Sequence, residues 1–248
     1  MASILADTHK YLTTIKDSLS RTARSGGHTM FALDQMDWRP LGEKLARHLV
    51  TMAKDGAAEG LGQVHHTKIK RDRGPTKNEL LELLHLADEE AIEWAEERAA
   101  ELVGLHRNPD GSWDVSDQPG MSISETTRTG VRELVTDAMT DGWSNDRLAD
   151  AIEGAYEFSD TRCETIARFE TAQADLEGNR AGWRNSGVVR GRRWDIGTDN
   201  IEVCDDCEQM DGEEVEGDDE FEGGNAPRHP RCRCNETPIM VDEEKEDE

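Results

Sequence analysis

The chain has 248 residues, and its 54 acidic against 29 basic side chains give a formal net charge of -25. This length suffices for one large domain or two modest ones, and it excludes a disulfide miniprotein. The negative charge and an aromatic content of only 5% are unlike those of a typical nucleic-acid-binding protein. Because the sequence has no apolar run of about 18 residues and no signal pattern at residues 1–10, we expect a soluble, unsecreted chain.

The acidic residues are spread through most of the chain, between apolar residues at helical spacing, and 21 Arg outnumber 8 Lys. This distribution favours the surface of a folded protein adapted to high salt over the alternative, a locally disordered acidic protein. In molar salt the Debye length falls to about 3 Å, so repulsion among the carboxylates is screened.

The first 75 residues differ in charge from the rest, with 12 basic and 8 acidic side chains and so a net charge of +4. The basic side chains include a cluster formed by Lys68, Lys70, Arg71 and Arg73. Such a run is either a solvated face or a contact for an acidic partner or for DNA.

Residues 1–40 are expected to form an N-terminal arm that docks on a partner. The apolar side chains expected to anchor it are Tyr11, Leu12, Phe31 and Trp38. The glycines at 26–27 and 60–62 are expected to act as flexible joints.

Residues 41–121 form a predicted helical region. Apolar residues at a spacing of three and four predict one long helix over about 76–105. Turn signals at Pro109 and Pro119 then predict a loop over 107–121.

Residues 122–180 are predicted to form three short consecutive helices. Ser124 and Ser144 are the expected N-caps of the first two, and Gly142 should end the first. The third should run toward Gly178.

Residues 181–241 are predicted to form a small β module, because β-branched residues there alternate with glycines. Within it, the stretch 205–225 is too acidic and glycine-rich for a core element, so we expect a loop. Residues 242–248 are expected to be an acidic tail.

Two groups of metal-ligand side chains frame that loop. They are Cys204 and Cys207, followed by His229, Cys232 and Cys234. Thiolates at this spacing, completed by a second soft cluster, predict a structural Zn²⁺ site that uses four of the five side chains. Two disulfides or free buried thiols are the alternative.

A catalytic role is not expected for this cluster, because a nucleophilic thiol needs a positioned base and catalytic zinc needs an open position. The sequence also has no phosphate loop, no Gly-rich strand-to-helix fingerprint and no paired-His zinc helix. We therefore expect no enzyme. The expected fold class is α+β, with a mainly helical N-terminal body and a small C-terminal β module stapled by zinc.

The ordered motifs of the C-terminal half add a family resemblance over about residues 122–240. They are Ile166-Ala167-Arg168-Phe169-Glu170-Thr171-Ala172, Trp194-Asp195, Val203-Cys204-Asp205-Asp206-Cys207, Met210-Asp211-Gly212, Pro227-Arg228-His229-Pro230-Arg231-Cys232-Arg233-Cys234 and Pro238. This set resembles the phage Mu F-like head morphogenesis family. Phe169 stands where the family has Thr, and the Arg168 and Glu170 positions match. These two side chains either tie the helix to different neighbours or are ordinary surface charges.

The resemblance implies a minor head protein, also called a minor capsid protein, of a tailed virus. Such a protein would be made in the host cytoplasm and would lie in the virion, inside the capsid near the portal. Its implied partners are the portal protein, the major capsid protein and packaged DNA, with no membrane contact. Together with the acidic composition, the resemblance implies a haloarchaeal host.

A zinc-ribbon-like nucleic-acid-binding or regulatory protein is the alternative function. The arginines that surround the predicted metal site would contact phosphate in that case, namely Arg190, Arg192, Arg193, Arg228, Arg231 and Arg233. The carboxylates at 213–222 oppose this alternative, because they repel DNA unless salt screens them.

Overall fold

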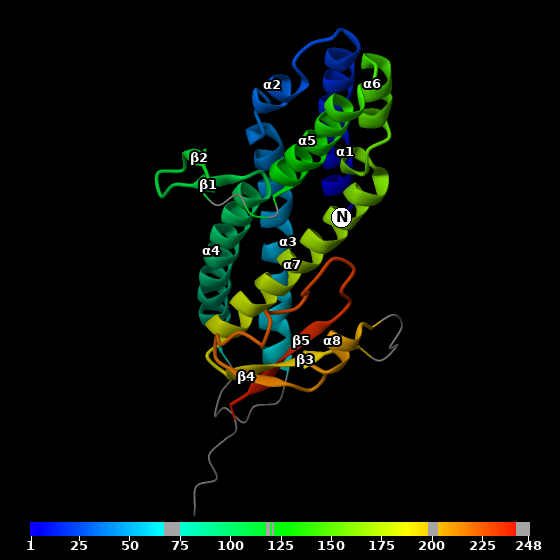
Figure 1. Cartoon of the computed structure of the whole chain (residues 1–248). Helices are drawn as coiled ribbons and strands as arrows, with labels where there is room; N and C mark the ends of the chain where they lie inside the picture. Colours follow the sequence, from blue (N-terminus) through cyan, green and yellow to red (C-terminus); the bar gives the residue numbers. More distant parts are fainter. Residues whose placement is uncertain (67–74, 118–119, 121, 198–202, 242–248) are drawn as a thin grey trace, which may run out of the picture. The chain divides into compact units, whose positions relative to one another are not determined.

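The fold is mainly α-helical, with two small antiparallel β-sheets in the part of the chain that is described (Figure 1). The computed structural model describes residues 1–66, 75–117, 120, 122–197 and 203–241. The helices are α1 (Ala2–Arg24), α2 (Thr29–Asp34), α3 (Arg39–His66), α4 (Lys77–Leu102), α5 (Ile123–Asp141), α6 (Asn145–Glu153), the 3-10 turn η1 (Tyr156–Phe158), α7 (Asp160–Ser186) and α8 (Asp205–Glu208). The strands are β1 (Leu105–Arg107), β2 (Trp113–Val115), β3 (Val189–Asp195), β4 (Glu214–Glu216) and β5 (Asn235–Met240). The predicted α+β class, with a mainly helical N-terminal body and a small C-terminal β module, is confirmed.

The chain divides into two compact units. Unit 1 comprises Met1–His48 and Glu96–Arg168, and unit 2 comprises Leu49–Ala95 and Phe169–Glu248. The helices α3, α4 and α7 contribute residues to both units. The predicted domain boundaries stay predictions, and the predicted acidic tail at 242–248 lies outside the described residues.

Helix α1 supplies much of the core of unit 1. Six of its seven buried residues recur every three or four positions, which places them on one face: Ile4, Thr8, Leu12, Ile15, Leu19 and Ala23. This face packs against α2 and α6. At the end of α1, the Arg24 guanidinium donates to Asp150 at 2.9 Å and to Glu153 at 2.6 Å, both on α6.

The set of apolar anchors predicted for the N-terminal arm is corrected by the burial of two of them. Leu12 is fully buried and Trp38 is 4% exposed, so both belong to the core of unit 1. Phe31 differs, because it is 67% exposed on α2. Of the four expected anchors, Phe31 is therefore the one that presents a large apolar surface.

Serine side chains cap the first turns of α5 and α6. Ser144 accepts a hydrogen bond from the Arg147 N–H at 3.1 Å and caps α6, as predicted. The predicted cap Ser124 is wrong, because Ser122 accepts from the Glu125 N–H at 3.1 Å and begins α5 two residues earlier. The helix ends at Gly142, which has φ 67°, as predicted.

The predicted loop over 107–121 contains a hairpin instead. Strands β1 and β2 pair antiparallel, and the Asn108 N–H donates to the Ser112 carbonyl at 2.8 Å in the turn. The turn signal at Pro109 was therefore correct, but the short flanking strands were missed. A Cβ on Gly42 would lie 2.5 Å from Cζ3 of the Trp113 ring. The ring therefore occupies the space that a side chain at position 42 would need.

In unit 2, helices α3 and α7 cross at glycine contacts. A Cβ on Gly60 would lie 2.5 Å from the Asn179 carbonyl oxygen, and one on Gly178 would lie 2.0 Å from the Ala53 carbonyl oxygen. Gly60 is thus a packing residue within a continuous helix, and the expected flexible joint at 60–62 is wrong. Helix α7 continues past Gly178, which is likewise an interior contact, and ends at Ser186.

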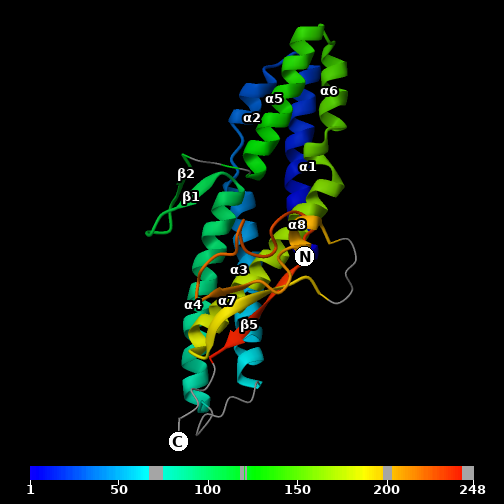
Figure 2. The same cartoon turned by 60° about the horizontal axis from the view of Figure 1, so that its bottom comes forward.

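Residues 189–241, called the C-terminal module below, form a three-stranded sheet of order β4-β3-β5. The sheet lies beside α7 in both views (Figures 1 and 2), and Leu176 of α7 joins its core. The stretch 205–225 is not merely a loop, because it supplies α8, β4 and the buried Phe221. The Phe221 ring meets Trp194 edge-on, with 5.3 Å between the ring centroids.

None of the described helices has both the length and the apolar character that crossing a membrane requires.

Candidate metal centre

A short helical turn places the first two cysteines together. Cys204 is the N-cap of α8 and Cys207 lies within it, and the Glu208 N–H donates to the Cys204 carbonyl at 2.9 Å. Side chains three residues apart in a helical turn lie on the same face. Cys207 is 1% exposed and belongs to the module's core, whereas Cys204 is half-buried.

A tight turn places His229 and Cys232 together. The Cys232 N–H donates to the His229 carbonyl at 2.9 Å, and Pro230 occupies the second position of the turn. Arg231, at the third position, has φ 68°, which is the conformation that a type II turn requires and that glycine usually supplies. The strained arginine thus lies between two of the predicted ligands.

All five predicted ligands lie in one cluster, four of them in these two turns and Cys234 just beyond the second. The ligand atoms of Cys204, Cys207 and His229 lie within 4.8 Å of one another, as do those of Cys207, Cys232 and Cys234. The His229 Nε2 lies 3.3 Å from Cys204 Sγ and 3.4 Å from Cys207 Sγ, and Cys207 Sγ lies 3.9 Å from Cys232 Sγ. Cys207 is the donor shared by both groups.

A backbone contact orients the histidine ring. His229 Nδ1 lies 2.9 Å from the Pro230 carbonyl oxygen, which accepts its hydrogen and leaves the Nε2 lone pair directed at the sulfurs. This hydrogen bond also raises the pKa of His229. Metal-binding histidines characteristically donate their second ring N–H to a carbonyl in this way.

The thiols differ in how readily they ionise. The Cys207 N–H hydrogen bond lowers the pKa of Cys204. Burial opposes ionisation of Cys232, but backbone hydrogen bonds from Arg228 and Cys234 hold its pKa below the ordinary value. Burial raises the pKa of Cys207, and it raises that of Cys234 to about 11.

The donor set fits a tetrahedral ion. Zn–S bonds of about 2.3 Å and Zn–N bonds of about 2.0 Å place bound sulfurs about 3.8 Å apart and sulfur and nitrogen about 3.5 Å apart. The observed separations of 3.3, 3.4 and 3.9 Å are close to these lengths. All five cysteines are free, so the disulfide alternative is wrong for this structure. The cluster could therefore hold a metal ion.

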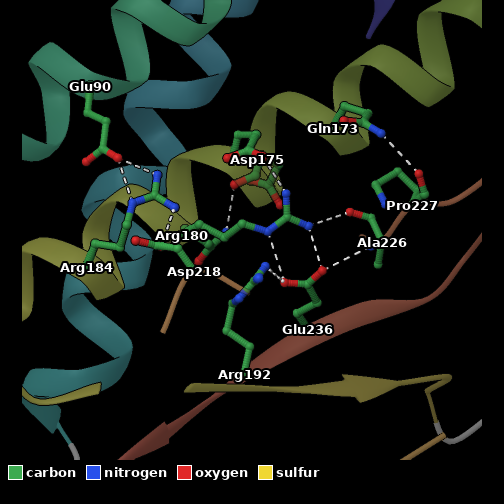
Figure 3. Close-up of polar contacts among 12 residues, drawn as sticks. Glu90, Gln173, Asp175, Arg180, Arg184, Arg192, Asp218, Ala226, Pro227 and Glu236 are labelled. Atoms are coloured by element: carbon green, nitrogen blue, oxygen red, sulfur yellow. Dashed lines mark hydrogen bonds and ion pairs between the residues drawn. The ribbon is translucent and has the colours of Figure 1, made fainter. Parts of the chain in front are cut away.

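A buried ion network beside this cluster was not predicted from the sequence (Figure 3). Its centre is Glu236, whose side chain is fully buried. The carboxylate accepts from Arg180 at 2.6 and 2.9 Å, from Arg192 at 2.8 Å and from the Ala226 N–H at 3.0 Å. No motif indicates it, because the three charged residues are far apart in the sequence and resemble surface charges.

The network fixes both ends of the segment that carries the second ligand group. Glu236 lies at one end of this segment and Ala226 at the other, and the Ala226 carbonyl accepts from Arg180 at 2.7 Å. Next to it, the Pro227 carbonyl accepts from Gln173 of α7 at 3.0 Å (Figure 3). Helix α7 therefore holds the base of the ligand-bearing segment.

The two family-motif charges lie on α7 in different environments. Arg168 is exposed, whereas Glu170 is 3% exposed. An ordinary surface charge is therefore the wrong interpretation for Glu170. The basic cluster of Lys68, Lys70, Arg71 and Arg73 lies outside the described residues.

Residues 129–237 match the model of a family described as "Phage Mu protein F like protein". The match covers less than half of the chain and supports the family resemblance for that segment. It spans most of α5 through the first half of β5, and it includes the Cys/His cluster and Glu236. Neither the curated proteins nor the solved structures gave a match.

Proposed function

We propose that this chain is a minor head protein of a tailed virus that acts in head assembly or in genome packaging and ejection. The match of residues 129–237 to the phage Mu F-like family carries the proposal, because head morphogenesis is the function that this resemblance implies. The protein would be made in the host cytoplasm and would lie in the virion, inside the capsid near the portal.

The proposed role is structural, without enzymatic activity, and the metal is Zn²⁺. Zinc bound by mixed cysteine and histidine ligands in a closed site supplies a cross-link between segments of the chain. Here it would join α8 to the turn at 229–232. The module would gain stability from the cross-link and could present a fixed surface to a neighbouring virion protein.

The proposed partners are the portal protein or the major capsid protein, with packaged DNA as a further candidate. Two features of the first 75 residues support docking there: their net positive charge and the exposed ring of Phe31. High salt screens exposed charge contacts, so an apolar side chain such as Phe31 would carry more of the affinity than the charges.

The proposed host is a haloarchaeon. The net charge of -25 supports this proposal, because a carboxylate-rich surface stays hydrated and soluble in molar salt. The thermal midpoint of the zinc-loaded protein should therefore rise between about 0.1 M and about 1 M salt, as the Debye length falls from about 10 to about 3 Å. A midpoint that stays flat over this range would remove the argument for a halophilic host.

The nucleic-acid-binding alternative keeps one supporting observation, the exposure of Arg231 between two predicted ligands. Other arginines of that hypothesis are engaged elsewhere in the C-terminal module. Arg192 is 5% exposed and bonded to Glu236, and Arg193 donates to Glu214 at 2.5 and 3.0 Å. Less cationic surface is thus free for phosphate than the sequence suggested.

Cross-linking mass spectrometry on intact virions tests the head-protein proposal. We expect cross-links from residues 1–75 to the portal or the major capsid protein. A chain that is missing from purified virions, or that is recovered with host nucleic acid instead, would overturn the proposal.

A pair of surface variants tests the docking site. Phe31→Ser should reduce incorporation into particles, whereas Met139→Ser, at a residue of unit 1 that is 81% exposed, should leave it unchanged. Equal incorporation of the two variants would move the docking surface away from Phe31.

A further inference from the structure

Five side chains compete for the four positions of a tetrahedral zinc site, and the contacts between their ligand atoms are unequal. Three distances between ligand atoms are close to those expected between neighbouring ligands of a tetrahedral ion. They join Cys204 to His229, His229 to Cys207, and Cys207 to Cys232. We propose that Cys204, Cys207, His229 and Cys232 hold the ion and that Cys234 stays outside the coordination sphere. This assignment rests on the proposal above that the module binds zinc.

The turns give independent support for this set. Each ligand pair comes from one backbone turn closed by a hydrogen bond, from the Glu208 N–H to the Cys204 carbonyl in the first turn and from the Cys232 N–H to the His229 carbonyl in the second. Both turns position their first and fourth residues, so their geometry selects Cys204 with Cys207 and His229 with Cys232. Cys234 lies beyond the second turn and directly precedes β5.

The surroundings of Cys234 provide an alternative role for it. The side chain is 7% exposed and belongs to the apolar cluster that also contains Trp194, Phe221 and the proposed ligand Cys207, so what separates Cys234 from Cys207 is its position outside both turns rather than its burial. A free cysteine in such a place acts as a small hydrophobic residue. Cys234 thus packs beneath the metal site, where its sulfur lies within 4.8 Å of the Cys207 and Cys232 sulfurs.

Alanine variants of the full-length chain, loaded with Co²⁺ in place of Zn²⁺, test the assignment. Thiolate-to-cobalt charge-transfer absorption grows with the number of bound thiolates, and the wild-type protein should show three. Cys234→Ala should keep both the full absorption and one ion per chain. Cys204→Ala and Cys232→Ala should each lose about a third of the absorption or all of the metal. Cys163→Ala, at a fully buried cysteine of unit 1, is the matched control and should behave as the wild type.

The outcomes separate the possible failures. If Cys234→Ala loses absorption while Cys232→Ala keeps it, Cys234 is the ligand and the assignment is overturned. If the wild-type protein already shows four bound thiolates and His229→Ala leaves that absorption unchanged, histidine is not a ligand and the assignment is likewise overturned. A wild-type chain that binds neither Co²⁺ nor Zn²⁺ would refute the metal site itself, whereas the head-protein proposal depends on the virion experiment.

Discussion

Unit 1 and the C-terminal module are stabilised in different ways. Unit 1 buries long apolar helix faces, such as the stripe on α1 from Ile4 to Ala23. The C-terminal module has strands of seven, three and six residues, and two of the seven buried residues in its core are cysteines. A hydrophobic core this small rarely keeps a domain folded by itself, and small domains are commonly stabilised further by a bound metal or by covalent cross-links. The comparison indicates that the module relies on its buried ion network and on the cross-link that the proposed zinc would supply, whereas unit 1 relies on apolar packing.

Removing the shared metal donor should have the largest effect. Cys207→Ala deletes the side chain common to both ligand groups, so it should abolish zinc binding and cost the C-terminal module about 5 kcal/mol or more. Metal analysis, together with urea unfolding followed by near-UV circular dichroism, measures both losses. Far-UV circular dichroism should show that most of the helix survives. Retention of stoichiometric zinc would contradict the prediction.

The buried ion network should give the next largest effect. Glu236→Gln leaves the buried guanidinium of Arg192 without its carboxylate partner and leaves Arg180 with Glu177 alone, and it should destabilise the module by about 3 to 5 kcal/mol. Urea unfolding of the zinc-loaded protein provides the measurement.

The matched control for the network is Glu214→Gln. Glu214 pairs with Arg193 in the same sheet, but both side chains are substantially exposed, so its loss should cost about 1 kcal/mol or less. Similar losses in the free energy of unfolding for the two substitutions would show that burial of the Glu236 network does not increase its contribution to stability.

A core substitution in unit 1 should separate the two regions. Leu12→Ala removes a fully buried side chain and should cost about 2 to 5 kcal/mol, depending on how far the cavity collapses. Because Leu12 lies in the other unit, the zinc content measured by elemental analysis should stay unchanged. A loss of zinc would mean that the two regions do not fold separately.

The smallest effect should come from the strained turn. Arg231→Gly supplies the residue that tolerates φ 68° and should stabilise the zinc-loaded module by about 1 kcal/mol. Thermal unfolding of the two proteins, at equal zinc concentration, measures the difference. A lower midpoint for the glycine variant would show that the arginine side chain contributes more than its backbone strain costs.

Local sequence signals predicted the elements that depend on local physics. The apolar spacing indicated the long helix now seen as α4, and Ser144 and Gly142 marked helix ends correctly. The spacing of the cysteines and His229 identified five side chains that the fold brings together. In each case the residues that set the outcome are close in sequence or belong to a recognisable motif.

Features that depend on distant partners could not be predicted in the same way. Glu236 is buried because Arg180 and Arg192 surround it, and neither its own type nor its neighbours in the sequence indicate this. Gly60 and Gly178 looked like joints or helix ends, because their function as contact points appears only when the facing backbone is known. The choice among five metal donors likewise depends on two turns that meet only in the fold.

Hydrogen exchange of the full-length chain, with zinc bound and after its removal by a chelator, tests the central claim most directly. The account predicts that amides of α8, β3 and β5 lose protection when zinc is removed, while those of α1 and α5 keep it. Unchanged protection in the C-terminal module, or an equal loss in both regions, would contradict it.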